Sequence, residues 1–262
     1  MGSKEKFWYR EAQTSWLFKF CRPGTGEDWA EKLAASIAAL LNLPHAIVEL
    51  AEYDGRRGSS CKRFTDGQTT LLHGNDVLLD HDPRYPNQQR YRVSAHTLEA
   101  IFHALSRFEV EPPANLGNHL TATDVFVGYI MLDALIGNTD RHHENWGLLR
   151  RRAHNRYVYE LAPTYDHASS LGRELRETSR AQRLATRDRN RTPEAYADRA
   201  RSALYASVNS PRPLSTFDAF ASAAQLLPNA AEYWLARLEA ITSPQLLAPI
   251  QRVPATHMQD SA

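Results

Sequence analysis

The sequence predicts an α+β protein with two lobes, a small lobe of antiparallel strands with one helix and a larger, mostly helical lobe. Short β-favouring runs and a single helical pattern occupy residues 1–72, and helical patterns fill most of residues 94–252. The stretch at 73–93 is rich in Asp, Pro, Asn and Gln and shows no periodicity, so we expect an irregular connector between the lobes there. Residues 253–262 are expected to form a flexible tail.

Two short aromatic runs, at 7–9 and 15–20, predict the first hairpin. Beyond the turn that follows, Thr25 with Asp28 three residues later is typical of a capped helix start. Apolar residues then recur at helical spacing, and the helix is expected to end near Asn42.

Two further strands are predicted at 46–53 and 59–64, bounded by Asp-Gly turns. In the larger lobe, helices are expected at about 94–107 and 122–136. The second of these is apolar on nearly all sides, so it should be the buried core helix. A second hairpin is predicted from runs at 146–149 and 156–161, followed by helical sequence to about residue 252.

Composition restricts the class of protein. The 262 residues are enough for a substantial core, and 42% hydrophobic residues with a net charge of +1 exclude wholesale disorder and an overall electrostatic attraction to nucleic acid. Two cysteines supply neither a disulfide framework nor a zinc site, and no stretch reaches the roughly 18 apolar residues of a membrane span. We therefore expect a soluble, cytoplasmic protein.

Three oxygen-bearing side chains lie where this order of elements would bring them together. Asp140 and Asn145 stand five positions apart in the loop that leaves the buried helix, and Asp166 follows the strand at 156–161. Phosphoryl transfer needs a carboxylate to orient the attacking hydroxyl, and oxygen ligands to hold Mg²⁺ against the nucleotide phosphates. The spacing therefore predicts a phosphotransferase site, and protein kinases have the same order of elements.

A cation for the phosphates is the next requirement, and Lys19 lies on a predicted strand between apolar neighbours. A carboxylate of the following helix, Glu31 or Glu27, could pair with it as in kinases. The alternative for Lys19 is an exposed strand lysine, and for either glutamate a solvated helix surface.

Four pieces of sequence resemble the HipA-like serine/threonine kinase family: GSKEK at 2–6, FKF at 18–20, NTDRHHEN at 138–145 and APTYD at 162–166. The resemblance covers residues 2–172 in order and spacing, and fits the helical remainder more loosely. It implies a protein-kinase-like fold with the catalytic core of the HipA carboxy-terminal domain, and use of ATP and Mg²⁺.

The resemblance also implies residue roles. Asp140 would be the catalytic base, with His142 as the histidine of a D-x-H-x-x-N pattern, and Asn145 and Asp166 would bind Mg²⁺. The strand SSCKRF at 59–64 matches the hinge that holds adenine. The residues expected to bind the nucleotide are Gly2, Ser3, Lys4, Glu5, Lys6, Lys19, Glu31, Lys62 and Phe64.

The partners that we expect from this resemblance are a protein substrate with a serine or threonine acceptor, translation-related proteins included, and an antitoxin-like partner chain. Neither membrane binding nor direct DNA binding is expected. Toxin-type members carry an additional amino-terminal subdomain and a regulatory serine before the phosphate loop, whereas Met1 stands directly before the loop here, so a bare catalytic core is predicted. Repeated arginines at 173–201 are either a surface for an acidic partner or a solvated face.

Three alternatives remain open from the sequence. The acceptor could be a small molecule or a lipid head group, because a fold does not determine an acceptor. The chain could also be a pseudokinase that binds nucleotide without transferring phosphate. Finally, His142, His143 and Glu144 could ligate zinc, although magnesium prefers the oxygen ligands named above.

Overall fold

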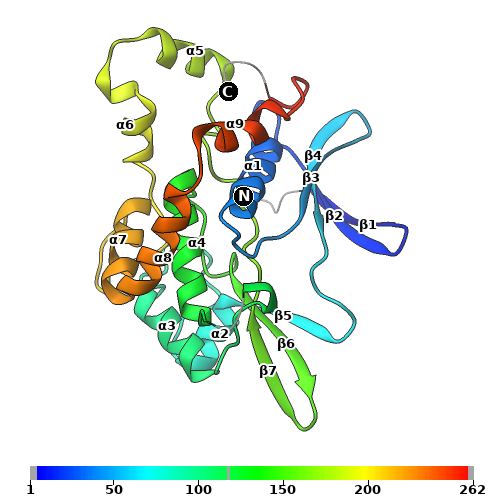
Figure 1. Cartoon of the computed structure of the whole chain (residues 1–262), viewed down its shortest axis with the longest axis vertical. Coiled ribbons are helices and arrows are strands. Elements are labelled where there is room, and N and C mark those ends of the chain that lie inside the picture. Colours follow the sequence, from blue (N-terminus) through cyan, green and yellow to red (C-terminus); the bar gives the residue numbers. More distant parts are fainter. Residues whose placement is uncertain (1–4, 117–118, 259–262) are drawn as a thin grey trace.

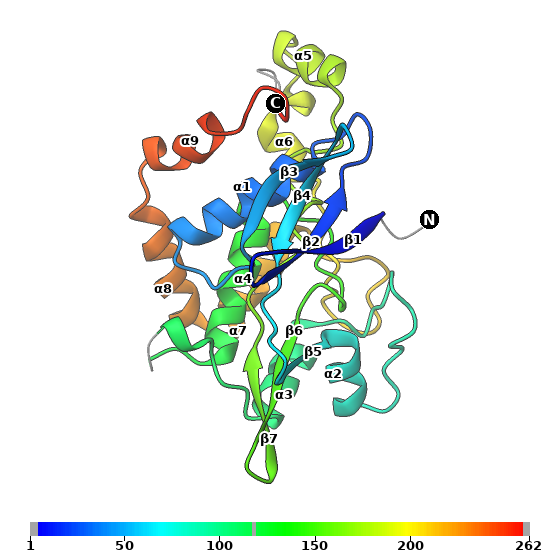
Figure 2. The same cartoon turned by 90° about the vertical axis from the view of Figure 1, so that its right-hand side faces the viewer.

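A computed structural model describes residues 5–116 and 119–258, and it shows two antiparallel sheets with a group of helices (Figure 1). The first sheet has the order β1-β2-β4-β3. Its strands are β1 (Lys6–Glu11), β2 (Thr14–Phe20), β3 (Val48–Tyr53) and β4 (Arg56–Lys62). Helix α1 (Glu27–Leu40) packs on β3 and β4 and buries its alanine-rich face there (Figure 2). The predicted strands and helix of the small lobe are confirmed.

The start of α1 differs from the prediction. Its N-cap is Gly26, without a side-chain cap, because the predicted cap residues have other partners. The Thr25 hydroxyl donates to a carbonyl of the preceding turn at 2.9 Å, and the Asp28 carboxylate contacts His257 at 2.8 Å. A Cβ at Gly26 would lie 2.0 Å from the Trp29 ring, so the close packing of this ring requires glycine.

The second sheet has the order β5-β6-β7. Strand β5 (Thr69–His73) pairs with β6 (Gly147–Ala153), which forms the predicted hairpin with β7 (Arg156–Leu161). Residues 69–72, predicted as the end of the small lobe, are thus part of the sheet that β6 and β7 form. The connector is not wholly irregular either, because α2 (Gly74–His81) forms within it. Two helical turns with few buried residues are too short to show periodicity in the sequence.

Helix α4 (Ala122–Ile136) is the centre of the larger core, as predicted. The Thr121 and Asp124 capping box begins it, and Gly137 ends it in the left-handed conformation with φ 62°. Helices α3 (Leu98–Arg107), α7 (Thr216–Leu226) and α8 (Pro228–Glu239) pack around it. A Cβ at Gly128 would lie 2.6 Å from the Trp234 ring, so α8 approaches the α4 backbone closely.

The remaining elements are short. They comprise the 3-10 turns Ala114–Leu116 and Arg189–Arg191 and the helices α5 (Glu177–Ala185), α6 (Pro193–Ala197) and α9 (Ser243–Gln251). Helices α5 and α6 extend away from the core at the top of Figure 1. The prediction of helix throughout this part of the chain is wrong for residues 198–215, which are irregular. No helix among the described residues is both long enough and apolar enough to cross a membrane.

The carboxy-terminal strap, residues 252–258, lies against the beginning of α1. Nδ1 of His257 is 2.8 Å from the Asp28 carboxylate, and the Arg57 guanidinium donates to the carbonyls of Thr256, at 3.0 Å, and His257. These polar contacts connect the predicted flexible tail to the small lobe at residues 256 and 257, and its flexibility stays a prediction. The part of that prediction at 259–262 lies outside the described residues.

Candidate active site

Lys19 on β2 joins three elements through its ammonium group. Its Nζ donates to Glu31 Oε1 on α1 at 3.1 Å and to Asp166 Oδ1 in the loop after β7 at 2.8 Å. The lysine side chain is 12% exposed. Burial by itself lowers the pKa of Lys19, but the carboxylates of Asp166 and Glu31 outweigh it and raise this pKa above its usual value. The lysine therefore remains a fixed positive charge at any physiological pH.

Of the two helix glutamates considered from the sequence, Glu31 is the one that contacts Lys19. Glu27 lies one turn earlier and pairs instead with Arg173 at 2.8 Å and with Arg22 at 3.3 Å. The Ser59 hydroxyl on β4 is 3.4 Å from the second oxygen of Glu31 and helps to hold it.

Asp166 has a backbone conformation that few residues adopt, with φ 60°. The segment before it is held by backbone hydrogen bonds to the small lobe. The Thr164 N–H donates to the Pro44 carbonyl and the Ala46 N–H donates to the Thr164 carbonyl, both at 2.9 Å. These contacts fix the Asp166 carboxylate, 35% exposed, next to Lys19.

The loop after α4 is built around an ion pair buried in the larger core. Asp133, in the last turn of α4, receives two hydrogen bonds of 2.7 Å from the Arg141 guanidinium and one of 2.8 Å from the Asn138 amide. Arg141 is 0% exposed and also donates to the Asn145 carbonyl at 3.0 Å. The loop therefore takes its shape from one aspartate inside the helix.

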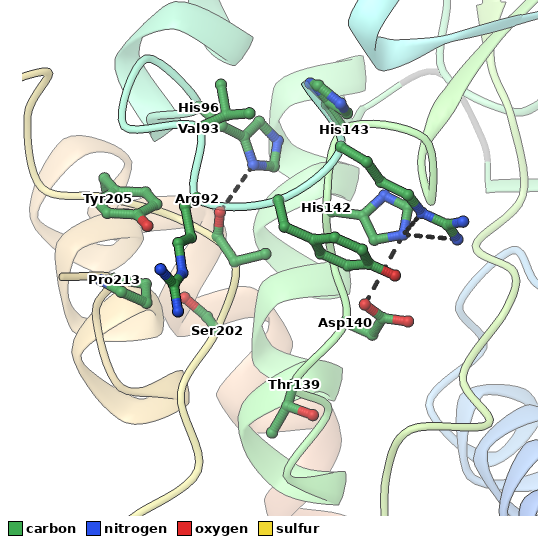
Figure 3. A pocket seen from close by; sticks show the side chains of 13 residues that line it. Arg92, Val93, His96, Thr139, Asp140, His142, His143, Ser202, Tyr205 and Pro213 are labelled. Atoms are coloured by element: carbon green, nitrogen blue, oxygen red, sulfur yellow. Dashed lines mark hydrogen bonds and ion pairs between the residues drawn. The ribbon is translucent and has the colours of Figure 1, made fainter. Parts of the chain in front are cut away.

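This loop brings the predicted residues Asp140 and Asn145 together. The Asn145 amide nitrogen donates to the Asp140 carbonyl at 2.7 Å, so the side-chain oxygen of Asn145 remains as its acceptor atom. The Asp140 carboxylate is 33% exposed and lines a cavity (Figure 3).

His142 is buried directly behind Asp140. Its Nδ1 accepts the Glu144 backbone N–H at 3.2 Å, and its Nε2 lies 3.3 Å from Nε of Arg90 and 3.7 Å from Oδ1 of Asp140. Burial, and next the positive charge of Arg90, lower the pKa of His142 to about 4. His142 is therefore neutral at physiological pH and packs against Asp140 without adding charge.

The residues predicted to hold adenine lie on and just after β4. The Phe64 ring is tilted by 31° to the Tyr165 ring, with centroids 5.6 Å apart, and so lies next to the loop that carries Asp166. Lys62 is opposite Trp16 in the sheet, and its N–H donates to the Ile47 carbonyl at 2.9 Å. Adenine binding by these residues stays a prediction.

The predicted phosphate loop is described only in its last two residues, since Gly2, Ser3 and Lys4 lie outside the described residues. Lys6 begins β1 directly opposite Lys19, so this end of the segment pairs with the strand that carries the buried ammonium group. Glu5 pairs with Arg56 at 2.9 Å on the exposed surface. A role of these two residues in covering phosphates stays a prediction.

Sequence reasoning missed Asp133, Arg141 and Arg90. A signal for Asp133 was present, because it is the one charged residue in the interior of an otherwise apolar run, and a buried charge needs a partner. Zinc, the alternative considered for His142, His143 and Glu144, finds no support. Among the described residues, no group of three or more His, Cys, Asp or Glu side chains could hold a metal ion.

Acidification is expected to destabilise the protein through buried neutral histidines. His96 accepts the Trp146 indole N–H at 3.1 Å and lies 3.0 Å from the Ala203 carbonyl, and burial lowers its pKa to about 3. Because these folded-state pKa values lie below the unfolded value of about 6.5, the unfolded chain binds more protons below that pH. Stability is therefore complete above pH 6.5 and is lost as pH falls toward 4. His96 and His142 together should cost about 3 kcal/mol between pH 6.5 and 5.

Urea denaturation at these two pH values measures this loss. His96→Gln should reduce the drop by about 1.5 kcal/mol, the share of one buried histidine. His154→Asn, in the exposed turn between β6 and β7, should leave it unchanged. A free energy of unfolding that is equal at both pH values would contradict the expectation.

Comparison with known proteins places the chain in a family. The chain matches the model of the HipA-like C-terminal domain over residues 1–243. It is similar to the serine/threonine-protein kinase CtkA of Helicobacter pylori strain J99, with 27% identity over 161 residues, which are 56% of this chain and 41% of that protein. The match thus spans less than half the length of this curated relative.

Two solved structures are similar in fold. The crystal structure of CtkA, a proinflammatory kinase of Helicobacter pylori, has a TM-score of 0.74 and 21% identity, and the match covers 97% of this chain and 83% of that one. HipA, in a complex with HipB and operator DNA from Shewanella oneidensis MR-1, has a TM-score of 0.50 and 13% identity, with 96% and 64% covered. The predicted α+β, kinase-like fold is confirmed.

Proposed function

The chain belongs to the family of HipA-like C-terminal domains, and from this premise we propose that it transfers the γ-phosphoryl group of ATP to a serine or threonine hydroxyl of a protein. The observation that carries the proposal is the contact of Lys19 with Glu31 and Asp166 across three elements. The similarity to a serine/threonine-protein kinase supports the class of acceptor.

Lys19 would bind the phosphate oxygens of ATP. It is a buried cation on the second strand of a rigid sheet, and Glu31 holds its position from α1. A fixed charge in a partly dehydrated site interacts strongly with phosphate, because little solvent screens it. Glu31 is therefore assigned the positioning of Lys19.

Asn145 and Asp166 would hold Mg²⁺, and their donor atoms fit it. Mg²⁺ takes oxygen ligands and typically binds through one or two carboxylates together with substrate phosphates. Asp166 offers a partly exposed carboxylate, and Asn145 offers its side-chain oxygen because its nitrogen is bonded to Asp140. When bound, Mg²⁺ would neutralise charge on the phosphate oxygens.

Asp140 would orient the acceptor hydroxyl and take its proton as phosphate transfers. Its carboxylate lines the cavity, and its backbone carbonyl is tied to Asn145. Asp140 and the magnesium ligand Asn145 are thereby held in one loop. This arrangement would fix the attacking hydroxyl oxygen relative to the phosphates. His142 would act as a positioning residue that limits the movement of Asp140.

An antitoxin-like partner chain stays a prediction. The Shewanella structure contains HipA with HipB and operator DNA, and this supports a search for a partner by co-purification from native cells.

Asp166→Asn is expected to remove phosphoryl transfer from labelled ATP while the fold remains intact. Asparagine tolerates the left-handed backbone at this position, so only a charge is lost. Asp54→Asn is the matched control, because Asp54 also has positive φ, 51°, in the exposed turn between β3 and β4.

The parent and Asp54→Asn should label protein, and Asp166→Asn should label at least about 100-fold less. Parent protein that binds ATP in calorimetry but labels neither itself nor any protein of a cell extract would contradict the proposal. ATP turnover that depends on an added small molecule, again without labelled protein, would show that the acceptor is a small molecule.

A further inference from the structure

A cavity of about 240 Å³ lies beside Asp140, and Lys19 is not among the residues that line it. Three segments that are distant in the sequence supply its walls, residues 90–96, 139–143 and 202–213. Figure 3 shows them around one space, with Asp140 and His142 on one side and Ser202 and Pro213 on the other. Because Asp140 lines this cavity, the acceptor group would have to enter it.

Two of these segments, 90–96 and 202–213, contain no predicted site residue, and they are hydrogen-bonded to each other. The Tyr205 N–H donates to the His96 carbonyl at 3.0 Å, and His96 Nδ1 lies 3.0 Å from the Ala203 carbonyl. His96 in turn accepts the indole N–H of Trp146 from the larger core. The cavity is therefore formed by the fold and does not depend on a bound substrate.

Two arginines line the cavity, and their charges are compensated differently. Arg90 pairs with Glu144 at 3.2 Å, so its charge is neutralised locally. Arg92 is exposed, and within residues 5–116 and 119–258 no acidic side chain forms an ion pair with it. Figure 3 shows Arg92 on the wall of Ser202 and Pro213, across the cavity from Asp140.

The backbone directs Arg92 into this place. Arg92 has φ 58°, an uncommon conformation for arginine, and Gln89 stabilises it by donating to the carbonyls of Tyr91, at 3.0 Å, and Arg92, at 3.2 Å. Val93, next in the chain, is buried and anchors the segment in the core. An arginine placed in this way offers a planar set of donors to a carboxylate or phosphate.

Resting on the proposed function, we infer that the cavity selects acceptor segments in which an acidic residue stands close to the serine or threonine. Asp140 would hold the acceptor hydroxyl, and Arg92 would bind the neighbouring carboxylate or phosphate from the opposite wall. An extended peptide rises about 3.3 Å per residue, so a cavity of this size spans about two or three residues. The acidic residue is therefore expected within about three positions of the acceptor.

The test compares synthetic peptides that differ only in one flanking residue, with a single serine followed or preceded by glutamate, glutamine or lysine. For the parent, KM for the glutamate peptide should be about tenfold lower than for the glutamine peptide, as for one charge-assisted hydrogen bond. Arg92→Gln should remove this preference by raising KM for the glutamate peptide, with little change of kcat. Arg92→Lys should restore part of it, because a charge remains.

Arg156→Gln is the matched control, since Arg156 is an exposed arginine at the start of β7. It should keep the parent's preference. The preference should also shrink as salt rises, because the anion meets Arg92 at an exposed site. Peptides with phosphoserine in place of glutamate show whether Arg92 prefers a phosphate or a carboxylate, because KM is lower for the preferred anion.

The outcomes separate this inference from the proposed function. Transfer to all three peptides with equal KM, or a preference for lysine, would overturn the inference while the kinase assignment stands. The same holds for an acidic preference that Arg92→Gln leaves intact. Absence of transfer to every peptide and to every protein in a cell extract would refute the kinase assignment, and the inference with it.

Discussion

Asp140→Asn is expected to lower phosphoryl transfer by a factor of about 10²–10⁴, the range for loss of a positioned general base. Asparagine has the same shape but cannot accept the hydroxyl proton as the new bond forms. The Asn145 amide binds the main-chain carbonyl of Asp140, and the substitution leaves this contact in place. Nucleotide affinity should therefore stay within about twofold of the parent value.

The control for this variant is Asp80→Asn, an exposed aspartate on α2 that removes one charge at a distance from the loop. It should leave transfer unchanged. Circular dichroism and thermal unfolding verify that both variants are folded. Transfer by Asp140→Asn at a rate near that of the parent would show that Asp140 is not the base. Only the proposed roles in binding ATP and Mg²⁺ would then remain.

Asp133→Leu is expected to cause the largest loss of stability, about 3–5 kcal/mol. Arg141 is 0% exposed, and without Asp133 its charge would remain buried with only neutral partners. The Asn138 amide, which also donates to Asp133, would lose its acceptor. Urea denaturation measures this loss directly.

The double variant Asp133→Leu with Arg141→Met separates stability from function. Replacing both members of a buried ion pair by apolar residues of similar volume is often nearly neutral for stability. Most of the lost free energy of unfolding should therefore return. Phosphoryl transfer should stay low, because the hydrogen bond from Arg141 to the Asn145 carbonyl is missing and the loop is less well positioned.

A single Asp133→Leu variant that is as stable as the parent would contradict this account of the buried pair. So would a double variant that regains full transfer, because the loop would then not depend on Arg141. The two readouts are independent, so either part of the argument can fail alone.

The sequence predicts those features whose determinants are local. The α4 capping box is an example, because Thr121 and Asp124 satisfy each other within one turn. The start of α1 carries a similar pattern, yet Asp28 is bound by His257 from the far end of the chain. A window of a few residues holds no information on such a partner, and so the predicted cap was wrong.

The same distinction applies to the site. Asp140 and Asn145 lie in one loop, so their proximity follows from their spacing, and the order of elements was enough to expect Lys19 near Asp166. The roles assigned to these residues stay predictions. Arg92 lies in a non-periodic segment that is hydrogen-bonded to residues 202–205. Its place in the same cavity as Asp140 is therefore seen only in the three-dimensional structure.

The carboxy-terminal strap also has a consequence for the order in which the protein can fold. It supplies His257 and two main-chain carbonyls to Asp28 and Arg57, which belong to the small lobe near the start of the chain. During synthesis the small lobe emerges well before these partners, because Thr256 and His257 follow Arg57 by 199 and 200 residues. The small lobe therefore has a buried carboxylate without its histidine until the strap has been synthesised, so its packing at the start of α1 is completed late in folding.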